Sequence, residues 1–313
     1  MLTIRSVNIS KEKGTVKTPY EFITLDASGV TEDAHAGPWH RQVSLLGEEA
    51  YQMMNLDLVE FPYGSFAENI TTTGSPSQEI PDLKHCQPGD RFHSGDILLE
   101  VTQIGKKCHG PECAIFKKAG DCVMPREGIF ARVLAGGTLK PGDRLHYERK
   151  EYRVSVITVS DRAYEGVYED CSGPQLERLL QEFCKQNHWP VTVSRTLLPD
   201  DPDRLRLVLE NVIQEGYDMI FTTGGTGIGP SDMTPYVVKP FFDKEIPGLM
   251  EYIRVTYGKE NPNALLSAAV AGVAGKTLIF TLPGSVRAIK EYFTEIARSL
   301  KHMIYMQMGL DVH

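Results

Sequence analysis

The chain has 313 residues and a formal net charge of −8, with 41% of its residues apolar and 24% charged. A protein that binds nucleic acid needs a basic face to release counterions, so this balance argues against a nucleic-acid partner. No apolar run approaches the ~20 residues that cross a bilayer, and the first residues lack the regions of a signal peptide. We therefore expect a cytoplasmic protein without a membrane segment, in which backbone amides still allow a small anion to bind.

The length predicts two domains, because a domain usually contains about 100–200 residues. A disulfide scaffold is not expected in a cytosolic chain of this size, so each thiol is either buried and inert or reactive. The six cysteines are Cys86, Cys108, Cys113, Cys122, Cys171 and Cys184.

Residues 1–147 contain short β-type runs separated by turn signals, and helical periodicity is weak except in residues 47–59. This pattern predicts a β-barrel or a compact β-rich domain. The clearest runs are residues 41–46, 96–104 and 129–134, and the clearest turns are Pro88-Gly-Asp and Pro141-Gly-Asp.

A charged joint at residues 147–153 precedes a different pattern, in which strands alternate with helices. This alternation predicts a mostly parallel sheet covered on both faces, an α/β/α domain over residues 152–313. We expect Ser172 to be the N-cap of the first helix and Asp201 that of the second. The expected elements are strands at 153–159, 191–197, 218–223 and 277–282, helices from Ser172 and Asp201, and a long helix from Ser285 to about Met306.

The carboxyl ends of four expected strands carry small, glycine, proline or acidic residues. In a parallel sheet these ends meet at one edge, where ligands bind. Four such strand ends at one edge are stronger evidence for a ligand site than any single strand end. They are residues 159–162, 198–201, 222–232 and 282–285.

The loop Gly224-Gly-Thr-Gly227 is a candidate phosphate cradle, because glycine allows positive φ and turns backbone amides toward an anion. It lacks the lysine of a Walker loop and does not match the dinucleotide fingerprint G-x-G-x-x-G. The alternative is a tight turn without a ligand.

Asp200 and Asp232 are the candidate acidic pair at these strand ends. Nucleotidyl transfer uses Mg²⁺ to neutralise phosphate charge, and carboxylate oxygens are ligands that Mg²⁺ prefers. The alternative is that each aspartate only caps a helix or shapes a turn.

Six motifs occur in order from about Arg153 to Met306. Together they resemble the molybdopterin adenylyltransferase family, which is related to the G domains of gephyrin-like proteins. The motifs are Ser160-Asp-Arg, Leu198-Pro-Asp, Thr222-Thr-Gly-Gly-Thr-Gly, Asp232-Met-Thr-Pro, Glu245-Ile-Pro-Gly and Leu282-Pro-Gly-Ser.

The resemblance implies an α/β/α fold, usually a homotrimer, that joins the phosphate of molybdopterin to AMP from ATP with Mg²⁺. It implies Asp232 at the metal and reaction centre and Asp200 as a second functional carboxylate. Ser231 stands where some members have an arginine. The implied substrate- and nucleotide-binding residues are Ser160, Asp161, Thr223, Gly224, Gly225, Thr226, Gly227, Thr234, Pro283, Gly284 and Ser285.

The first half resembles the MOSC domain, named for the C-terminal domain of molybdenum-cofactor sulfurases. The resemblance implies a β-rich fold over residues 1–147 that carries sulfur on a cysteine or binds the cofactor, and it leaves a pyridoxal phosphate contact open. The stretches that carry it are residues 33–46, 64–70, 89–92 and 101–108.

Cys108 stands where this family has its cysteine, and the adjacent Lys106 and Lys107 favour the thiolate that carries sulfur. The alternative is an idle thiol. A zinc site formed by Cys108, His109, Cys113 and Cys122 is disfavoured, because the paired C-x-x-C spacing is missing.

Three further residues of the first half, His35, His40 and Arg41, either line an anion pocket or are exposed turn residues; the sequence leaves both readings open.

Two hypotheses follow from the two halves. In the first, the chain is a molybdopterin adenylyltransferase fused to a MOSC domain, which acts beside other cofactor-assembly proteins. In the second, it is a carrier that binds molybdopterin or the cofactor without transferring AMP.

Overall fold

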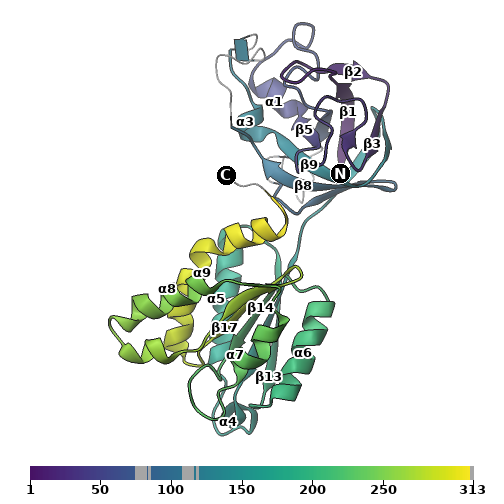
Figure 1. Cartoon of the computed structure of the whole chain (residues 1–313). Coiled ribbons are helices and arrows are strands. Elements are labelled where there is room, and N and C mark those ends of the chain that lie inside the picture. Colours follow the sequence, from purple (N-terminus) through teal and green to yellow (C-terminus); the bar gives the residue numbers. More distant parts are fainter. Residues whose placement is uncertain (75–82, 84–85, 108–115, 118–119, 311–313) are drawn as a thin grey trace. The chain divides into compact units, whose positions relative to one another are not determined.

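The computed structural model describes residues 1–74, 83, 86–107, 116–117 and 120–310. The chain folds into two compact units, shown in Figure 1. The N-terminal unit comprises Met1–Lys150 together with Gly309 and Leu310, and the C-terminal unit comprises Glu151–Met308. Within the described residues, no helix has the length and apolar character needed to cross a membrane.

The N-terminal unit is a closed β-barrel. Seven strands pair in the order β11-β7-β8-β9-β5-β6-β1, and β1 closes the barrel by pairing with β11 at Leu2 and Leu145. Among the described strands of this barrel, β5 and β6 form the one parallel pair. The barrel strands are β1 (Leu2–Ile9), β5 (Val43–Gly47), β6 (Ile70–Gly74), β7 (Arg91–Ser94), β8 (Ile97–Ile104), β9 (Ile129–Ala135) and β11 (Arg144–Glu148), and β2 (Thr18–Tyr20) extends the sheet beside β1.

Apolar side chains fill the barrel, because alternate residues of each strand point inward. Val7, Leu45 and Leu99 are fully buried there. The described part of the unit also contains a small sheet of β10 (Gly137–Leu139), β3 (Ile23–Asp26) and β4 (Gly29–Val30), and the short helices α1 (Glu48–Met53) and α3 (Met124–Glu127). The β-rich barrel expected from the first half is therefore confirmed.

The helix expected over residues 47–59 is much shorter than its periodicity indicated. The helix α1 ends at Met53, and Asn55 adopts a positive φ of 52° that stops the helix. Likewise the strand expected from Arg41 begins only at Val43.

The C-terminal unit is an α/β/α domain around a six-stranded sheet of order β13-β12-β14-β17-β16-β15. The first four strands of this order are parallel, and β16 pairs antiparallel with both of its neighbours, β17 and β15. The strands are β12 (Tyr152–Val159), β13 (Val191–Leu198), β14 (Met219–Thr223), β15 (Lys244–Glu245), β16 (Ala271–Ala274) and β17 (Thr277–Leu282). The helices are α4 (Asp161–Tyr164), α5 (Ser172–Gln186), α6 (Pro202–Gln214), α7 (Thr234–Val238), η3 (Lys239–Phe241), α8 (Pro247–Gly258), η4 (Pro262–Leu266) and α9 (Val286–Gln307).

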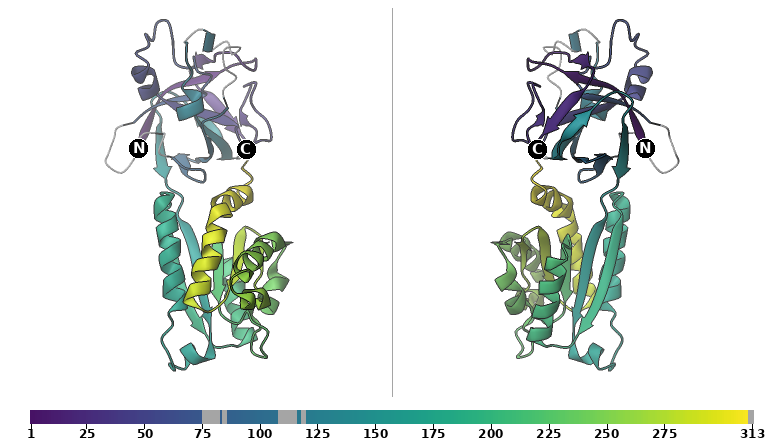
Figure 2. Two further views of the ribbon diagram at one scale, coloured as in Figure 1. Left: turned by 90° about the vertical axis from the view of Figure 1, so that its left-hand side faces the viewer. Right: turned by 90° about the vertical axis from the view of Figure 1, so that its right-hand side faces the viewer.

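Helices cover both faces of this sheet. The helices α5 and α9 lie side by side on one face, as Figure 2 shows, where Phe221 of β14 packs against Phe293 of α9. On the other face, Ile220 of β14 packs with Leu205 of α6 and Val237 of α7. Successive residues of one strand thus serve opposite layers, and the predicted three-layer fold is confirmed.

One helix cap differs from the prediction. The N-cap of α5 is Cys171 rather than Ser172, and the carboxylate of Asp170 accepts hydrogen bonds from the backbone N–H groups of Ser172 and Gly173. Asp170, the residue before the N-cap, therefore accepts hydrogen bonds from backbone N–H groups of the first turn that have no partner within the helix. Asp201 caps α6, as expected from the sequence, and Ser285, where the long helix was expected to begin, is the N-cap of α9.

Candidate functional site

The carboxyl ends of the four parallel strands meet at one edge of the C-terminal sheet. The register pairs Val159 with Leu198, Thr158 with Thr223, and Thr223 with Leu282. The loops after these strands therefore begin at the same level, as the sequence predicted.

A pocket of about 950 Å³ lies at this edge. Two predicted site residues, Asp161 and Thr234, do not line it. The predicted residues that do are Ser160, Asp200, Thr223, Gly224, Gly225, Thr226, Gly227, Asp232, Pro283, Gly284 and Ser285.

The glycine loop fits against its neighbours so closely that it has no room for side chains at its start. Gly224 has a φ of +100°, and a Cβ atom there would lie 2.2 Å from the carbonyl oxygen of Val159. A Cβ on Gly225 would lie 2.5 Å from the hydroxyl oxygen of Thr234. Thr234 thus packs against the loop but is not among the residues that line the pocket.

The carboxylate of Asp232 folds back into the loop that precedes it. Its Oδ2 atom accepts a hydrogen bond of 2.8 Å from the backbone N–H of Gly229. The same oxygen would lie 2.6 Å from a Cβ on Gly227, so glycine there lets the carboxylate approach the loop. Asp232 is half-buried and lines the pocket, where its remaining oxygen lone pairs are available to a ligand.

Asp161 and Asp200 bind each other's backbone at the ends of β12 and β13. The N–H of Asp161 donates to Oδ2 of Asp200 at 3.0 Å, and the N–H of Asp200 donates to Oδ1 of Asp161 at 2.8 Å. This reciprocal pair fixes two strand ends against one another. The sequence indicated both residues but not their pairing.

Two long helices begin at the pocket. Ser285 lines the pocket and caps α9 by accepting from the N–H of Ala288, while Cys171 and Ser172 line it at the start of α5. Burial alone would raise the pKa of Asp170, but hydrogen bonds from Gly173, Ser172 and Thr158 outweigh burial and hold that pKa below its ordinary value. The positive ends of both helix dipoles favour a negatively charged ligand.

A further polar group that lines the pocket was not predicted. It contains Asn261, Asn263 and Ser267 around η4, and Glu291 and Tyr292 on α9. For the α9 part of this group, the sequence did contain a signal. Ser285, Ala288 and Tyr292 are three and four residues apart, and residues with this spacing share one face of a helix.

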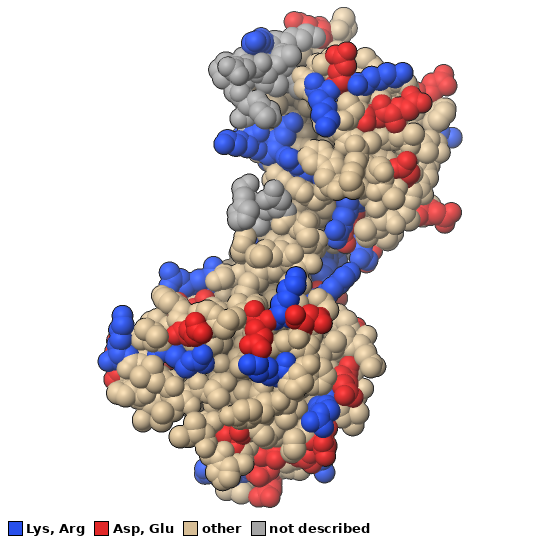
Figure 3. Space-filling view, viewed as in Figure 1, with Lys and Arg blue, Asp and Glu red and all other residues tan. Residues whose placement is uncertain are grey.

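The structure describes every residue of the C-terminal unit. Among them, the only charged side chains that line the pocket are carboxylates. Asp and Glu side chains gather at the end of this unit where α4 lies, as Figure 3 shows. The carboxylates that line the pocket are Glu169, Asp170, Asp200, Asp232 and Glu291.

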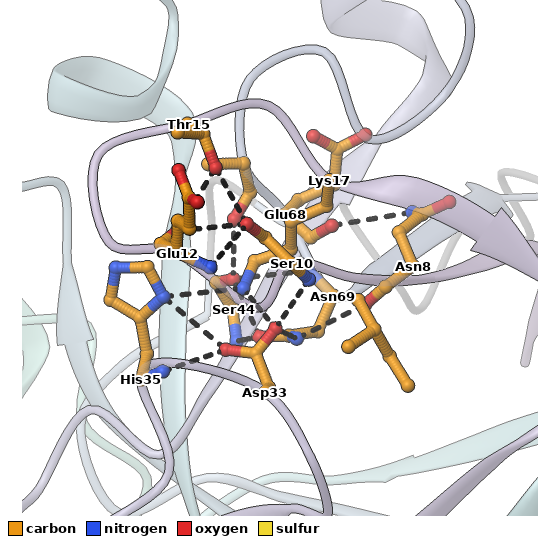
Figure 4. Close-up of polar contacts among 12 residues, drawn as sticks. Asn8, Ser10, Glu12, Thr15, Lys17, Asp33, His35, Ser44, Glu68 and Asn69 are labelled. Carbon is orange, nitrogen blue, oxygen red and sulfur yellow. Dashed lines mark hydrogen bonds and ion pairs between the residues drawn. The ribbon is translucent and has the colours of Figure 1, made fainter.

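The N-terminal unit contains a second group of interacting polar residues, drawn in Figure 4. We call Lys17, Asp33, His35, Glu68 and Asn69 the polar centre. The side chains of Lys17 and Asp33 are 1% and 0% exposed and form an ion pair, and His35 Nδ1 lies 3.2 Å from Asp33 Oδ1. Burial lowers the pKa of Lys17. Burial alone would raise the pKa of Asp33, but His35 and Lys17 hold it below its ordinary value.

The stretch Gly64–Asn69, part of the MOSC resemblance, builds the frame of this polar centre. Glu68 is fully buried and accepts hydrogen bonds from the hydroxyl of Tyr51 and the N–H groups of Gly64 and Phe66, and burial raises its pKa. The side-chain amide of Asn69 donates to Asp33 at 3.1 Å and to the carbonyl of Asn8. The stretch therefore holds Asp33 in place.

The cations predicted near this region have definite neighbours. His40 Nε2 lies 3.1 Å from Gln103 Oε1, and the guanidinium of Arg41 lies 4.8 Å from the ring centroid of Trp39. Lys106 lies 5.9 Å from the ring centroid of Phe130. The sequence left open whether His35, His40 and Arg41 line an anion pocket. In the structure His35 belongs to the polar centre, and His40 and Arg41 contact neighbouring side chains.

The predicted cysteine chemistry lies mostly outside the described residues. Cys108, His109 and Cys113 are not among them. Cys122 is buried, and Cys86 and Cys184 are buried with raised pKa values. In the part of the chain that the structure describes, no three His, Cys, Asp or Glu side chains come together to hold a metal ion.

Comparison with protein families divides the chain at the same place. The model described as "Probable molybdopterin binding domain" matches residues 155–302, and the MOSC domain matches residues 32–146. The fold and the strand-end pocket thus define a molybdopterin-binding type of α/β/α domain joined to a MOSC barrel.

Individual relatives match the C-terminal half. Molybdopterin adenylyltransferase from Helicobacter pylori is 33% identical over 157 residues, which cover 50% of this chain and 88% of the relative. The same enzyme from Pyrococcus furiosus is 33% identical and is covered to 90% of its length. Gephyrin from Dictyostelium discoideum is 34% identical over 50% of this chain, which spans about a quarter of gephyrin's length (23%). The chain belongs to the molybdopterin adenylyltransferase family through its C-terminal half, and it carries a MOSC domain in its N-terminal half.

Proposed function

We propose that this protein acts in molybdenum cofactor biosynthesis and that its C-terminal unit adenylylates molybdopterin with ATP. The observation that carries the proposal is the pocket at the ends of four parallel strands, with Asp232 beside the glycine loop. The names and coverage of the relatives support the assignment.

In this reaction an oxygen of the molybdopterin phosphate attacks the α-phosphorus of ATP. A new P–O bond forms, the bond from the α-phosphorus to the bridging oxygen breaks, and pyrophosphate leaves with that electron pair. The amides and hydroxyls around Gly224–Gly227 and Ser285 hold the phosphates in line. Positioning contributes strongly to the rate, because it turns an encounter of two substrates into a step within one complex.

Mg²⁺ fits the donor set of the pocket. Carboxylate oxygens are its preferred ligands, and it is usually bound by one or two carboxylates together with substrate phosphates and water. Asp232 and Asp200 would hold it, and the metal would neutralise charge on the phosphates. Asp161 would keep Asp200 oriented through the reciprocal pair.

We also propose that the protein forms a homotrimer through its C-terminal unit and acts in the cytoplasm beside other cofactor-assembly proteins. Four apolar side chains of α8 and η4 support an interface there, because each is at least half exposed: Tyr252, Val255, Leu265 and Leu266. Analytical ultracentrifugation tests the oligomeric state.

For the MOSC barrel we propose sulfur transfer on Cys108 or binding of the cofactor. The buried charges of the polar centre support a defined site in the barrel rather than a surface of scattered charges. Mass spectrometry after exposure to a persulfide donor tests the first role: added sulfur on Cys108 supports it, and an unmodified Cys108 contradicts it.

The test of the main proposal combines the full chain with molybdopterin, ATP and Mg²⁺. We expect release of pyrophosphate and formation of adenylylated pterin. The Asp232→Asn variant keeps the shape of the loop and should react at least about a hundredfold more slowly. If the wild-type chain binds molybdopterin but releases no pyrophosphate, the carrier hypothesis replaces the enzyme.

A further inference from the structure

One arginine of the N-terminal unit has a buried donor without a partner. The Nε atom of Arg41 is buried, and no residue that the structure describes accepts a hydrogen bond from it or forms an ion pair with its guanidinium. A buried N–H group of a cation that lacks a partner costs free energy, so its presence in a folded protein needs an explanation. Other arginines of the unit pair with carboxylates: Arg5 with Glu48, Arg91 and Arg132 with Glu100, and Arg126 with Asp121.

Aromatic rings hold the guanidinium of Arg41 in place. Its Cζ atom lies 4.8 Å from the ring centroid of Trp39 and 5.8 Å from that of Phe130. Trp39 is fixed in turn, because its indole N–H donates to the backbone carbonyl of His35 at 2.8 Å. A cation–π contact uses the charge of the guanidinium but none of its N–H groups. Arg41 is therefore oriented while its donors stay available.

Lys106 brings a second positive charge to the same aromatic ring. Its Nζ atom lies 5.9 Å from the ring centroid of Phe130, and no carboxylate in the described part of the chain pairs with it. Lys106 is also close to the polar centre: burial is the main cause of the lowered pKa of Lys17, and repulsion from Lys106 adds to it. Two cations thus lie beside one ring without a counter-charge from the described protein.

The barrel positions both cations through segments that are far apart in the sequence. Arg41 stands just before β5, and Lys106 stands just after β8. The hydroxyl of Thr102 in β8 donates to the backbone carbonyl of His40, and His40 Nε2 lies 3.1 Å from Gln103 Oε1. These contacts fix the residue next to Arg41 against the strand that leads to Lys106.

We infer that Arg41 and Lys106 form a binding site for a tetrahedral oxyanion, either a free dianion such as sulfate or molybdate or the phosphate group of a monoester. A guanidinium presents parallel N–H donors that match two oxygens of such a group, and an ammonium adds a second charge. The site depends neither on AMP transfer in the C-terminal unit nor on sulfur transfer in the barrel.

The test titrates the full chain with sulfate, molybdate, ribose 5-phosphate and acetate at constant ionic strength and follows tryptophan fluorescence. Trp39 lies against Arg41, whereas the second tryptophan of the chain, Trp189, is buried in the C-terminal unit and gives a constant background. We expect a saturable change with half-saturation near about 1 mM for the preferred anion, as two charge-assisted hydrogen bonds would provide. Acetate, with a single charge, should bind at least about tenfold more weakly.

The anions also separate the two sources of the oxyanion. Tighter binding of sulfate or molybdate than of ribose 5-phosphate identifies a site for the free dianion. The opposite order identifies a site for a phosphate monoester.

The variants are Arg41→Lys, which keeps the charge without the planar donors, and Lys106→Gln, which leaves the contact of Arg41 with Trp39 intact. Arg144→Gln is the matched control, because Arg144 is exposed on β11 and other strands separate β11 from β5 on both sides of the barrel. We expect the first two variants to raise the half-saturation concentration about three- to tenfold and the control to change it less than about twofold.

The absence of a saturable change with every dianion overturns the inference, and so does acetate binding as tight as that of sulfate. An equal effect of Lys106→Gln and Arg144→Gln shows that only net charge acts and overturns the site. Thermal unfolding of each variant confirms that it is folded. Adenylyl transfer is measured separately: a chain that binds the oxyanion but forms no adenylylated pterin contradicts the proposed function and leaves this inference standing.

Discussion

The two units of this chain treat charge in opposite ways. In the barrel, the polar centre buries Lys17, Asp33 and Glu68 and gives each of them close hydrogen-bond partners. In the C-terminal pocket, five carboxylates line a cavity that no Lys, Arg or His side chain lines, and Glu291 is the one that we find paired with an arginine, Arg287. Buried charges of the first kind stabilise the fold only as a set, whereas open carboxylates of the second kind are available to a ligand.

This difference separates the expected effects of substitution. Removing one member of the polar centre leaves another charge buried and unpaired, so the barrel should lose stability. Altering a carboxylate of the pocket should change ligand binding more than folding. The following experiments test that separation, and hydrogen exchange on peptides from each unit measures the stability of the two units independently.

We expect the largest effect from Lys17→Met. Asp33 would remain in the barrel without its ammonium partner, and breaking a buried pair costs about 3–5 kcal/mol. Exchange should accelerate in residues 1–74 and stay unchanged in residues 151–308. Lys140→Met, at an exposed position, is the control and should have little effect. An equal loss in both units would contradict the assignment of this pair to the barrel alone.

Gly224→Ala tests a position where the pocket should also affect folding. Its positive φ and the contact of a Cβ with Val159 predict a loss of about 2–4 kcal/mol in the C-terminal unit, with loss of nucleotide binding. Gly216 also has a positive φ, of +74°, but open space around a Cβ. Gly216→Ala should therefore cost about 1 kcal/mol and leave binding intact. Similar behaviour of the two variants would show that close packing of the loop is unimportant.

Acid should weaken the barrel through Asp33. Its pKa in the folded protein lies below the ordinary value of about 3.9, so its contribution is complete above that pH. The contribution is lost as the pH falls from about 4 toward the folded pKa, and we expect a loss of about 1–3 kcal/mol between about pH 4 and pH 2. Urea denaturation across this range measures it. The Asp33→Asn variant has no carboxyl to titrate at this position. If its free energy of unfolding falls as steeply with pH as that of the wild type, the acid sensitivity belongs to other groups.

The smallest effect concerns the reciprocal pair. Asp161→Asn keeps an oxygen that can accept from the N–H of Asp200, whereas Asp161→Ala does not. We expect nucleotide affinity to change less than about twofold in the first variant and to fall about three- to tenfold in the second, the equivalent of one hydrogen bond. Equal losses in both variants would indicate that the charge of Asp161 matters, rather than its hold on Asp200.

Much of the fold followed from local patterns in the sequence. The strands β12, β14 and β17 are β-branched or aromatic runs, and parallel pairing places their ends at one edge, so the pocket followed from the order of the elements. The strands β15 and β16 were not predicted, because Ala271-Gly-Val-Ala274 is short and rich in small residues, and the side chain of Phe242 fills the space beside Gly272. The helix α8 also escaped prediction.

The partners of the site residues were harder to predict than the residues themselves. Lys17, Asp33 and Asn69 stand far apart in the sequence, in loops beside the strands, and the fold of the N-terminal unit brings them together. The same holds for Asp161 and Asp200, which meet because β12 and β13 are neighbours in register. The polar group around η4 reaches the pocket from a segment whose sequence resembles a simple turn.

Closure of the barrel also constrains the order in which the protein can fold. Strand β1 pairs with β11 at Leu2 and Leu145, so the first and last strands of the barrel are separated by almost the whole N-terminal unit. Contacts of such long sequence separation form slowly, because a long loop must close before they stabilise anything. During synthesis, Leu2 cannot pair until Leu145 has left the ribosome. Until then, the backbone polar groups of β1 that pair with β11 lack that strand. Deleting β11 should therefore leave nascent barrels dependent on chaperones, while the C-terminal unit, whose parallel strands pair across shorter connections, folds by itself.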